Sequence, residues 1–185
     1  MFGRQKQTTK PNAKWNYQRD DENRIIVNMT VKDDSNFLSV FSENSTPVIS
    51  TEVAEFIENG TSSIYPKEQL TLRIHSNCID DEEKALYKEA IKEYYTKKYI
   101  ANARELKRNR WIVFILSIFG VFALGMSLMC DYWTNDPIRT EVIDIVAWVL
   151  LWEAVDIGVF GNRALRLKQK YYLSYLSMKI EYIQL

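Results

Sequence analysis

The stretch Trp111–Cys130 constrains the fold of this chain more than any other. It reads WIVFILSIFGVFALGMSLMC, twenty residues without a charged side chain. An α-helix needs about 20 apolar residues to cross the roughly 30 Å hydrocarbon core of a bilayer. A second apolar run, 142–160, follows and contains three carboxylates. We therefore predict two transmembrane helices, at 111–130 and 142–161, joined by an external loop at 131–141.

Basic residues flank the outer ends of both apolar runs, whereas the connecting loop holds one base, Arg139, and three acids. The flanking bases are Lys97, Lys98, Arg104, Lys107, Arg108 and Arg110 before the first run, and Arg163, Arg166, Lys168 and Lys170 after the second. By the positive-inside rule, both chain ends lie in the cytoplasm and the loop lies outside a plasma membrane. We expect Trp111, Arg108, Arg110, Arg163 and Arg166 to be the membrane anchors. The alternative, two core helices of a soluble protein, does not explain basic flanks at both ends.

Outside the apolar runs, the pattern predicts a small cytosolic α+β domain. Arg24–Val31 is β-branched and reads as a strand, and Gln69–Ser76 alternates apolar and polar side chains as a strand with one buried face. In that second strand, Thr71 belongs to the face expected to point outward. Thr51–Gly60 reads as a short helix, and Met178–Tyr182 predicts a third strand that returns to the same domain.

A long helical stem connects this domain to the membrane. Asp80 and Glu83 have the spacing of a capping box, and no Gly or Pro follows until Gly120. The resulting domain plan has a basic, mostly disordered tail at 1–23, the α+β domain at 24–79, the stem at 80–110, and a C-terminal helix and strand at 162–185. The expected fold is thus a small sheet-plus-helix domain on a helical stem that leads into a two-helix transmembrane hairpin.

The carboxylates of the second apolar run are its most unusual feature. A charged side chain near the bilayer centre costs at least about 2.5–3.5 kcal/mol, so it needs an explanation. Asp144 lies near the outer surface and is expected at an outer mouth. Glu153 and Asp156 lie roughly 15 and 10 Å inside the basic flank at Arg163, and they share one helix face because they are three residues apart. At matching depth the first helix offers only Ser117.

Three readings of Glu153 and Asp156 remain open. In an oligomer they would surround a wet axis and favour cations. They could instead bind arginine side chains or stay protonated and hold helices together, or they could form a proton or metal site. We expect a homo-oligomer in membrane lipid that conducts cations or permeabilises the membrane under control of its cytosolic domain. The alternative is a non-conducting anchor or assembly subunit that recruits a cytosolic partner.

Composition and motifs argue against several other classes of function. From Arg24 to Thr96 the chain has seven bases and thirteen acids, a balance of −6, which disfavours direct nucleic-acid binding. The single histidine, His75, the two cysteines and the absence of phosphate-loop or nucleophile motifs give no sign of an enzyme, a metal or a cofactor. A cytosolic protein or a nucleotide-type ligand remains a possible regulator of the α+β domain.

The segment EVIDIVAWVLLWEAVDIGVFGNRALRLKQKYYLSYLSMKIEY, at 141–182, resembles small two-helix membrane proteins of bacteria. These share a Trp-Glu-Ala-Val-Asp segment near the inner end of their last helix, here 152–156. Residues 37–42 and 51–60 also look like the soluble part of that group. The architecture is similar to that of membrane effectors of bacterial antiviral defence, which oligomerise and depolarise the membrane. The first resemblance implies the architecture and little about activity.

Overall fold

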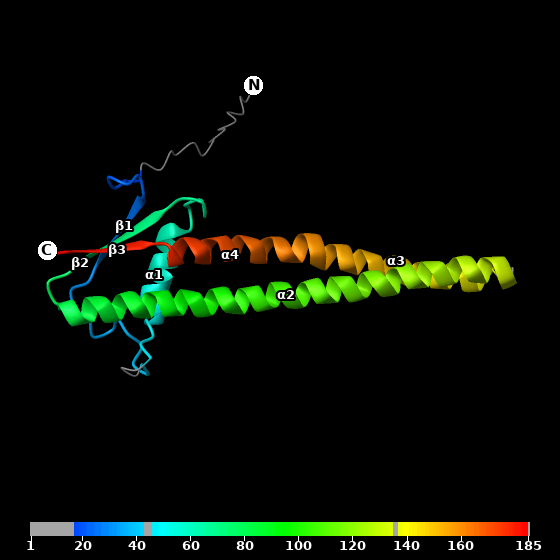
Figure 1. Ribbon diagram of the computed structural model, residues 1–185, viewed down its shortest axis with the longest axis horizontal. Helices are drawn as coiled ribbons and strands as arrows, with labels where there is room; N and C mark the ends of the chain where they lie inside the picture. Colours follow the sequence, from blue (N-terminus) through cyan, green and yellow to red (C-terminus); the bar gives the residue numbers. More distant parts are fainter. Residues whose placement is uncertain (1–16, 43–45, 135–136, 185) are drawn as a thin grey trace, which may run out of the picture.

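A three-stranded sheet stands at one end of a long pair of antiparallel helices in the computed structural model (Figure 1). The structure describes residues 17–42, 46–134 and 137–184, so most of the expected basic tail at 1–23 and part of the expected loop lie outside it. The elements in chain order are β1 (Ile25–Thr30), α1 (Thr51–Thr61), β2 (Leu70–His75), α2 (Asp81–Thr134), α3 (Pro137–Val155), the π-helical stretch η1 (Asp156–Gly161), α4 (Asn162–Leu176) and β3 (Lys179–Ile183).

The sheet has the order β1-β2-β3, and both neighbours run parallel to β2. Val27 pairs with Leu72, and Ile74 pairs with Tyr182. Parallel neighbours need a crossover connection. Between β1 and β2 this connection contains α1, and between β2 and β3 it is the whole helical pair. The three expected strands are therefore present, and the apolar helices are inserted between two adjacent strands of one sheet.

One face of the sheet carries the hydrophobic core. Leu72 and Ile74 are 0% exposed, and they belong to one cluster with buried side chains of α1, α2 and α4. The sheet's other face was expected to include Thr71 as an outward residue, and this is wrong, because Thr71 is 0% exposed. Its hydroxyl donates a hydrogen bond to Oδ2 of Asp20, 2.7 Å away, since the chain before β1 folds over this position.

Local capping explains where the helices begin. The Oγ of Ser50 accepts a hydrogen bond from the backbone N–H of Val53, which starts α1. At α2, the N–H of Asp80 donates to Glu83 Oε2 at 2.9 Å and the N–H of Glu83 donates to Asp80 Oδ1 at 2.8 Å. This is the expected capping box. From there α2 continues for 54 residues, so the predicted fusion of stem and apolar run into one helix is confirmed.

One helix within the described residues, α2, is long and apolar enough to cross a membrane. The returning helix α3 does not meet the same criterion, because its 19 residues include four charged ones. They are Arg139, Glu141, Asp144 and Glu153. The structure thus supports one candidate span where two were expected. The turn is also shorter than the expected loop at 131–141, because α2 extends to Thr134 and α3 begins at Pro137.

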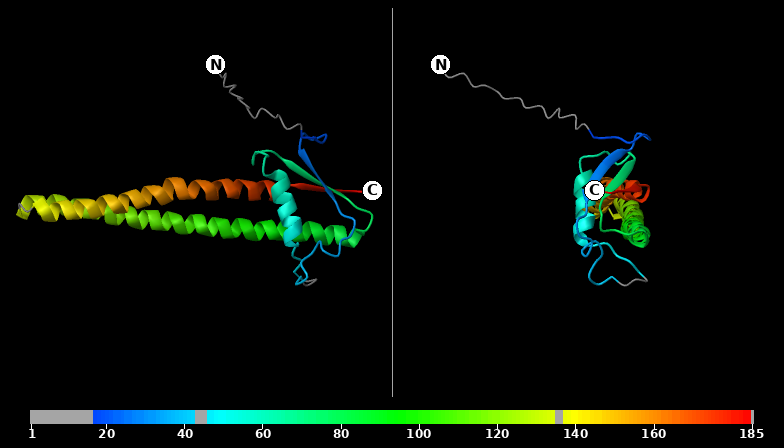
Figure 2. Two further views of the ribbon diagram at one scale, coloured as in Figure 1. Left: turned by 180° about the vertical axis from the view of Figure 1, so that it is seen from behind. Right: turned by 90° about the vertical axis from the view of Figure 1, so that its left-hand side faces the viewer.

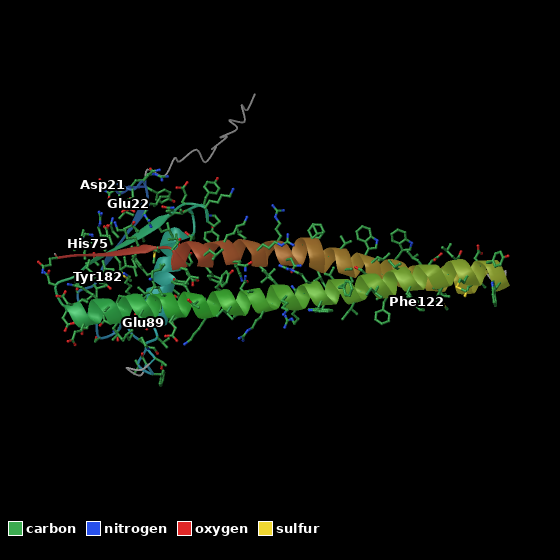
Figure 3. The ribbon with its side chains drawn as sticks, viewed as in Figure 1. Asp21, Glu22, His75, Glu89, Phe122 and Tyr182 are labelled. Carbon is green, nitrogen blue, oxygen red and sulfur yellow. The ribbon has the colours of Figure 1, made fainter. Side chains whose placement is uncertain are left out.

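The helices α2 and α3 lie side by side in Figure 1 and in the left view of Figure 2. Small residues make this contact close: Ala147 is 0% exposed, and a Cβ placed on Gly120 would lie 2.7 Å from the side chain of Leu151. Large apolar side chains cover the outside, as Phe122 of α2 shows in Figure 3. Only 11% of the most apolar 18-residue stretch of α2 is buried. Such a surface requires lipid or another protein to cover it.

Candidate functional site

The two acids of the returning helix point away from α2. Glu153 near the end of α3 and Asp156 at the start of η1 are both exposed, whereas Ala154 between them is buried at 4% exposure. Ala147, two turns earlier on the same face as Ala154, is also buried against α2. The contact between the helices therefore uses the small residues, and the carboxylates lie on the outer side of the helical pair.

Ser117 does not serve as the partner of these acids. It is half-buried in α2, and its Oγ donates a hydrogen bond to the carbonyl oxygen of Val113, 2.8 Å away in the same helix. In the part of the chain that the structure describes, no hydrogen bond or ion pair joins Glu153 or Asp156 to another side chain. The sequence grouped these three residues by depth, but the fold does not bring them together.

The expected basic anchors lie just before the apolar run of α2 and at the start of α4. Arg110, Arg163 and Arg166 are exposed, and Arg108 forms an ion pair of 3.7 Å with Glu105 of its own helix. Trp111 is 58% exposed. Among the described residues no ion pair connects Asp156 to Arg108 or Arg110. Asp144, the expected outer-mouth residue, is half-buried near the other end of α3.

Three asparagines join the stem part of α2 to α4, at positions for which the sequence predicted no contact. Asn102 donates from Nδ2 to the carbonyl oxygen of Leu165 at 2.9 Å, and Asn109 donates to Oδ1 of Asn162 at 3.2 Å. Asn102 and Asn162 are 6% and 3% exposed. The available signal was the seven-residue spacing of Asn102 and Asn109, which puts two amides on one helix face.

Asn162 also closes the π-helical stretch. Its backbone N–H donates to the carbonyl oxygen of Ile157, five residues earlier, and its Nδ2 contacts the carbonyl oxygen of Gly158 at 3.4 Å. π-Helical segments are uncommon and are frequent at functional sites. Here the segment begins at Asp156, so the wider helical turn lies immediately beside the outward-facing acid pair.

At the sheet end, ionic contacts cover the face that the helices leave open. Lys179 Nζ lies 3.1 Å from both Glu22 Oε1 and Glu181 Oε1, and Arg73 Nη2 lies 3.2 Å from Glu181 Oε2. The hydrogen bond from Lys179 lowers the pKa of each carboxyl group, and Arg24 and Arg73 add to the effect. These contacts link the C-terminal strand to the chain before β1.

The same end has two tyrosines between the sheet and the helices, of which Tyr175 is buried and Tyr182 is half-buried. Tyr182 of β3 donates to the carbonyl oxygen of Lys84 in α2 at 3.0 Å, and burial raises its pKa to about 12. Tyr175 of α4 shares a hydrogen bond of 2.8 Å with Oγ1 of Thr61 in α1. Both contacts connect the returning chain to residues that precede the apolar run of α2.

No group of three His, Cys, Asp or Glu side chains within the described ranges has the arrangement of a metal site. Comparison of the chain with protein-family models, with curated proteins and with solved structures gives no match. The candidate site therefore consists of the acid pair Glu153 and Asp156, the outward face that carries it, and the asparagine contacts that attach this helix to the stem.

Proposed function

We propose that this protein is an oligomeric integral membrane protein that conducts cations, or permeabilises the membrane, under control of its sheet domain. In this proposal the helical pair α2 and α3–η1 is a two-span hairpin, and both chain ends lie in the cytoplasm. The basic residues at Arg110 and Arg163 support this orientation, because they lie at the same end of the two helices.

The observation that carries the proposal is the outward exposure of Glu153 and Asp156. A carboxylate on a lipid-facing helix surface is costly, and intramembrane ionisable groups normally face a bundle interior or a water-filled cavity. The α2 side of α3 is already filled by Ala147 and Ala154. The acid pair can therefore avoid lipid through contact with another protein surface, and a second copy of the chain supplies an equivalent one.

Closed rings of identical subunits place the same side chains around a common axis. A ring of Glu153 and Asp156 would attract cations and exclude anions, as acidic rings do in cation channels. In this arrangement Asp144 lies toward the outer mouth. The four charged residues of α3 make it a poor lipid-exposed span, and they suit a helix that lines a wet axis.

Control by the sheet domain is supported by the chain connectivity. The apolar helices connect β2 to β3, and Asn102 and Asn109 attach the stem to α4. A movement of the sheet domain would therefore act on both helices at once. We propose that a cytosolic protein or a nucleotide-type ligand is the controlling partner. A role in bacterial antiviral defence is supported by resemblance of architecture alone.

The test is ion flux through vesicles that contain the purified full-length protein. The variant Glu153→Gln/Asp156→Asn is expected to abolish cation flux while the oligomer, measured by mass in detergent, persists. The matched control Asp131→Asn/Glu141→Gln removes two carboxylates from the turn end and is expected to retain most of the flux. Unchanged flux in the first variant, or a monomeric mass for the wild type, contradicts the proposal.

A second candidate function is a non-conducting membrane anchor that recruits a cytosolic partner. The observation in its favour is the sheet face opposite the helices, where Asn28 and Thr30 of β1 stay exposed, because parallel sheets are usually covered on both faces. Since β3 is contributed by the C-terminal chain, cutting the chain after the stem would remove a strand and is not a valid test. Partner binding by the full-length Glu153→Gln/Asp156→Asn variant, together with no flux from the wild type, would favour this candidate.

A further inference from the structure

An open groove of about 370 Å³ lies on α2 where the basic stem meets the apolar run. It is lined by Lys107, Arg110, Trp111 and Phe114. These positions follow the i, i+3, i+4, i+7 spacing of a single helix face. Two cations therefore lie at one end of the groove and two aromatic rings lie at the other.

The aromatic end of the groove is preformed. The rings of Trp111 and Phe114 pack edge to face with centroids 5.9 Å apart. They are nevertheless 58% and 56% exposed, so their outer surfaces are uncovered. On a helix long and apolar enough to cross a membrane, rings at this level lie where aromatic side chains gather at the membrane interface.

The basic end of the groove has no internal counterion. Arg108 on another side of the helix pairs with Glu105 at 3.7 Å. Lys107 and Arg110, by contrast, form no ion pair with any acid in the described part of the chain. Their positive charge is therefore available to an external anion. A guanidinium group binds phosphate oxygens in bidentate fashion, and a neighbouring ammonium adds a point charge.

We propose that this groove binds the phosphate headgroup of an anionic phospholipid of the cytoplasmic leaflet. Arg110 and Lys107 contact the phosphate, and the first part of an acyl chain lies on Trp111 and Phe114. The combination favours a lipid over a free phosphate ion, because the aromatic half of the groove has no role in binding a small anion. The inference depends on the proposal that α2 crosses a membrane, and it adds a lipid requirement to that function.

The experiment measures lipid retained by the full-length protein in neutral detergent, by native mass spectrometry. The probes are phosphatidylglycerol and phosphatidylcholine with the same acyl chains. We expect the wild type to retain phosphatidylglycerol selectively and Lys107→Gln/Arg110→Gln to weaken this binding by about thirtyfold. The matched control Lys88→Gln/Lys92→Gln removes the same charge from exposed positions near the start of α2 and is expected to leave retention unchanged.

Three results of the retention experiment would overturn the lipid site. They are equal retention of the two lipids, an equal loss in both double variants, and displacement of phosphatidylglycerol by millimolar inorganic phosphate, which would indicate a free-anion site. Occupation of the groove by a second copy of the chain would appear as a smaller oligomer mass for Lys107→Gln/Arg110→Gln, and would also overturn it. Flux in vesicles separates this inference from the proposed function: normal flux without lipid selectivity removes the lipid site alone, whereas failure to enter vesicles of either lipid removes the membrane assignment.

Discussion

The side-chain amide of Asn109 donates a hydrogen bond to Oδ1 of Asn162, 3.2 Å away, and so joins the stem helix to the first residue of α4. Asn162 is 3% exposed, and its own amide contacts the carbonyl oxygen of Gly158 at 3.4 Å. One side chain thus connects α2, the π-helical stretch and α4. A polar contact buried between helices in this way restricts how the returning helix can be rotated against the stem.

Replacing Asn162 by Leu should destabilise the helical pair by about 1–2 kcal/mol, because the half-buried amide of Asn109 loses its acceptor. Thermal unfolding in detergent, followed by circular dichroism, measures the change. Asn59→Leu in the exposed last turns of α1 is the control, with little expected effect. Equal stability of Asn162→Leu and the wild type would show that the contact contributes nothing.

Two buried tyrosines should respond oppositely to loss of the hydroxyl group. Tyr175 shares a hydrogen bond of 2.8 Å with Thr61, whereas the hydroxyl of Tyr95 is buried without a hydrogen-bond partner in the described residues. Tyr175→Phe should therefore cost about 0.5–1.5 kcal/mol, and Tyr95→Phe should be neutral or stabilising. Chemical unfolding of the two variants under one set of conditions makes the comparison. A larger loss in Tyr95→Phe would contradict this account.

Two glycines of α2 should differ in their tolerance of a larger side chain. A Cβ on Gly120 would lie 2.7 Å from Leu151, whereas a Cβ on Gly125 meets nothing within 4 Å. Gly120→Leu should separate α2 from α3 and destabilise their contact by about 1–3 kcal/mol, as overpacking does in cores. Gly125→Leu should leave this contact intact. Disulfide cross-linking between cysteines introduced on facing positions of α2 and α3 reports the separation, and equal cross-linking in both variants would refute it.

The ionic contacts of Lys179 predict a defined dependence of stability on pH. The pKa of the carboxyl groups of Glu22 and Glu181 is held below the usual 4.5, so their contribution is present above that pH and is lost as the pH falls further. The pKa of Lys179 is raised above 10.5 by its hydrogen bonds to Glu22 and Glu181, so its contribution is present below that pH and is lost as the pH rises through the raised pKa.

Lys179→Gln should therefore flatten the fall in melting temperature between pH 5 and acid conditions relative to the wild type. Lys67→Gln, at an exposed lysine before β2, should keep the wild-type slope. The measurement is a series of thermal melts of the detergent-solubilised protein across the acid range. Identical slopes for Lys179→Gln and the wild type would mean that these exposed contacts are screened by solvent.

The positions of the helix start and of the strands were predicted well, because capping and strand formation depend on residues that are close in sequence. The capping box of Asp80 and Glu83 forms as expected, and the three strands lie where β-branched and alternating residues indicated them. The outward prediction for Thr71 failed because the residue that buries it, Asp20, is 51 positions away in the chain. Alternation reports which side chains share a face, but it does not report what long-range segment covers that face.

Three features can be predicted from the residues alone: a chargeless run of membrane-spanning length, a small α+β domain and a pair of acids on one helix face. These follow from composition and from the helical and strand periods. The direction in which that acid face points, by contrast, depends on how the helices pack. The rotation of α3 about its axis is set by close packing of Ala147 and Ala154 against α2, so Glu153 and Asp156 face outward. A helical period gives the relative angles of side chains, whereas their direction in space depends on which face finds a partner.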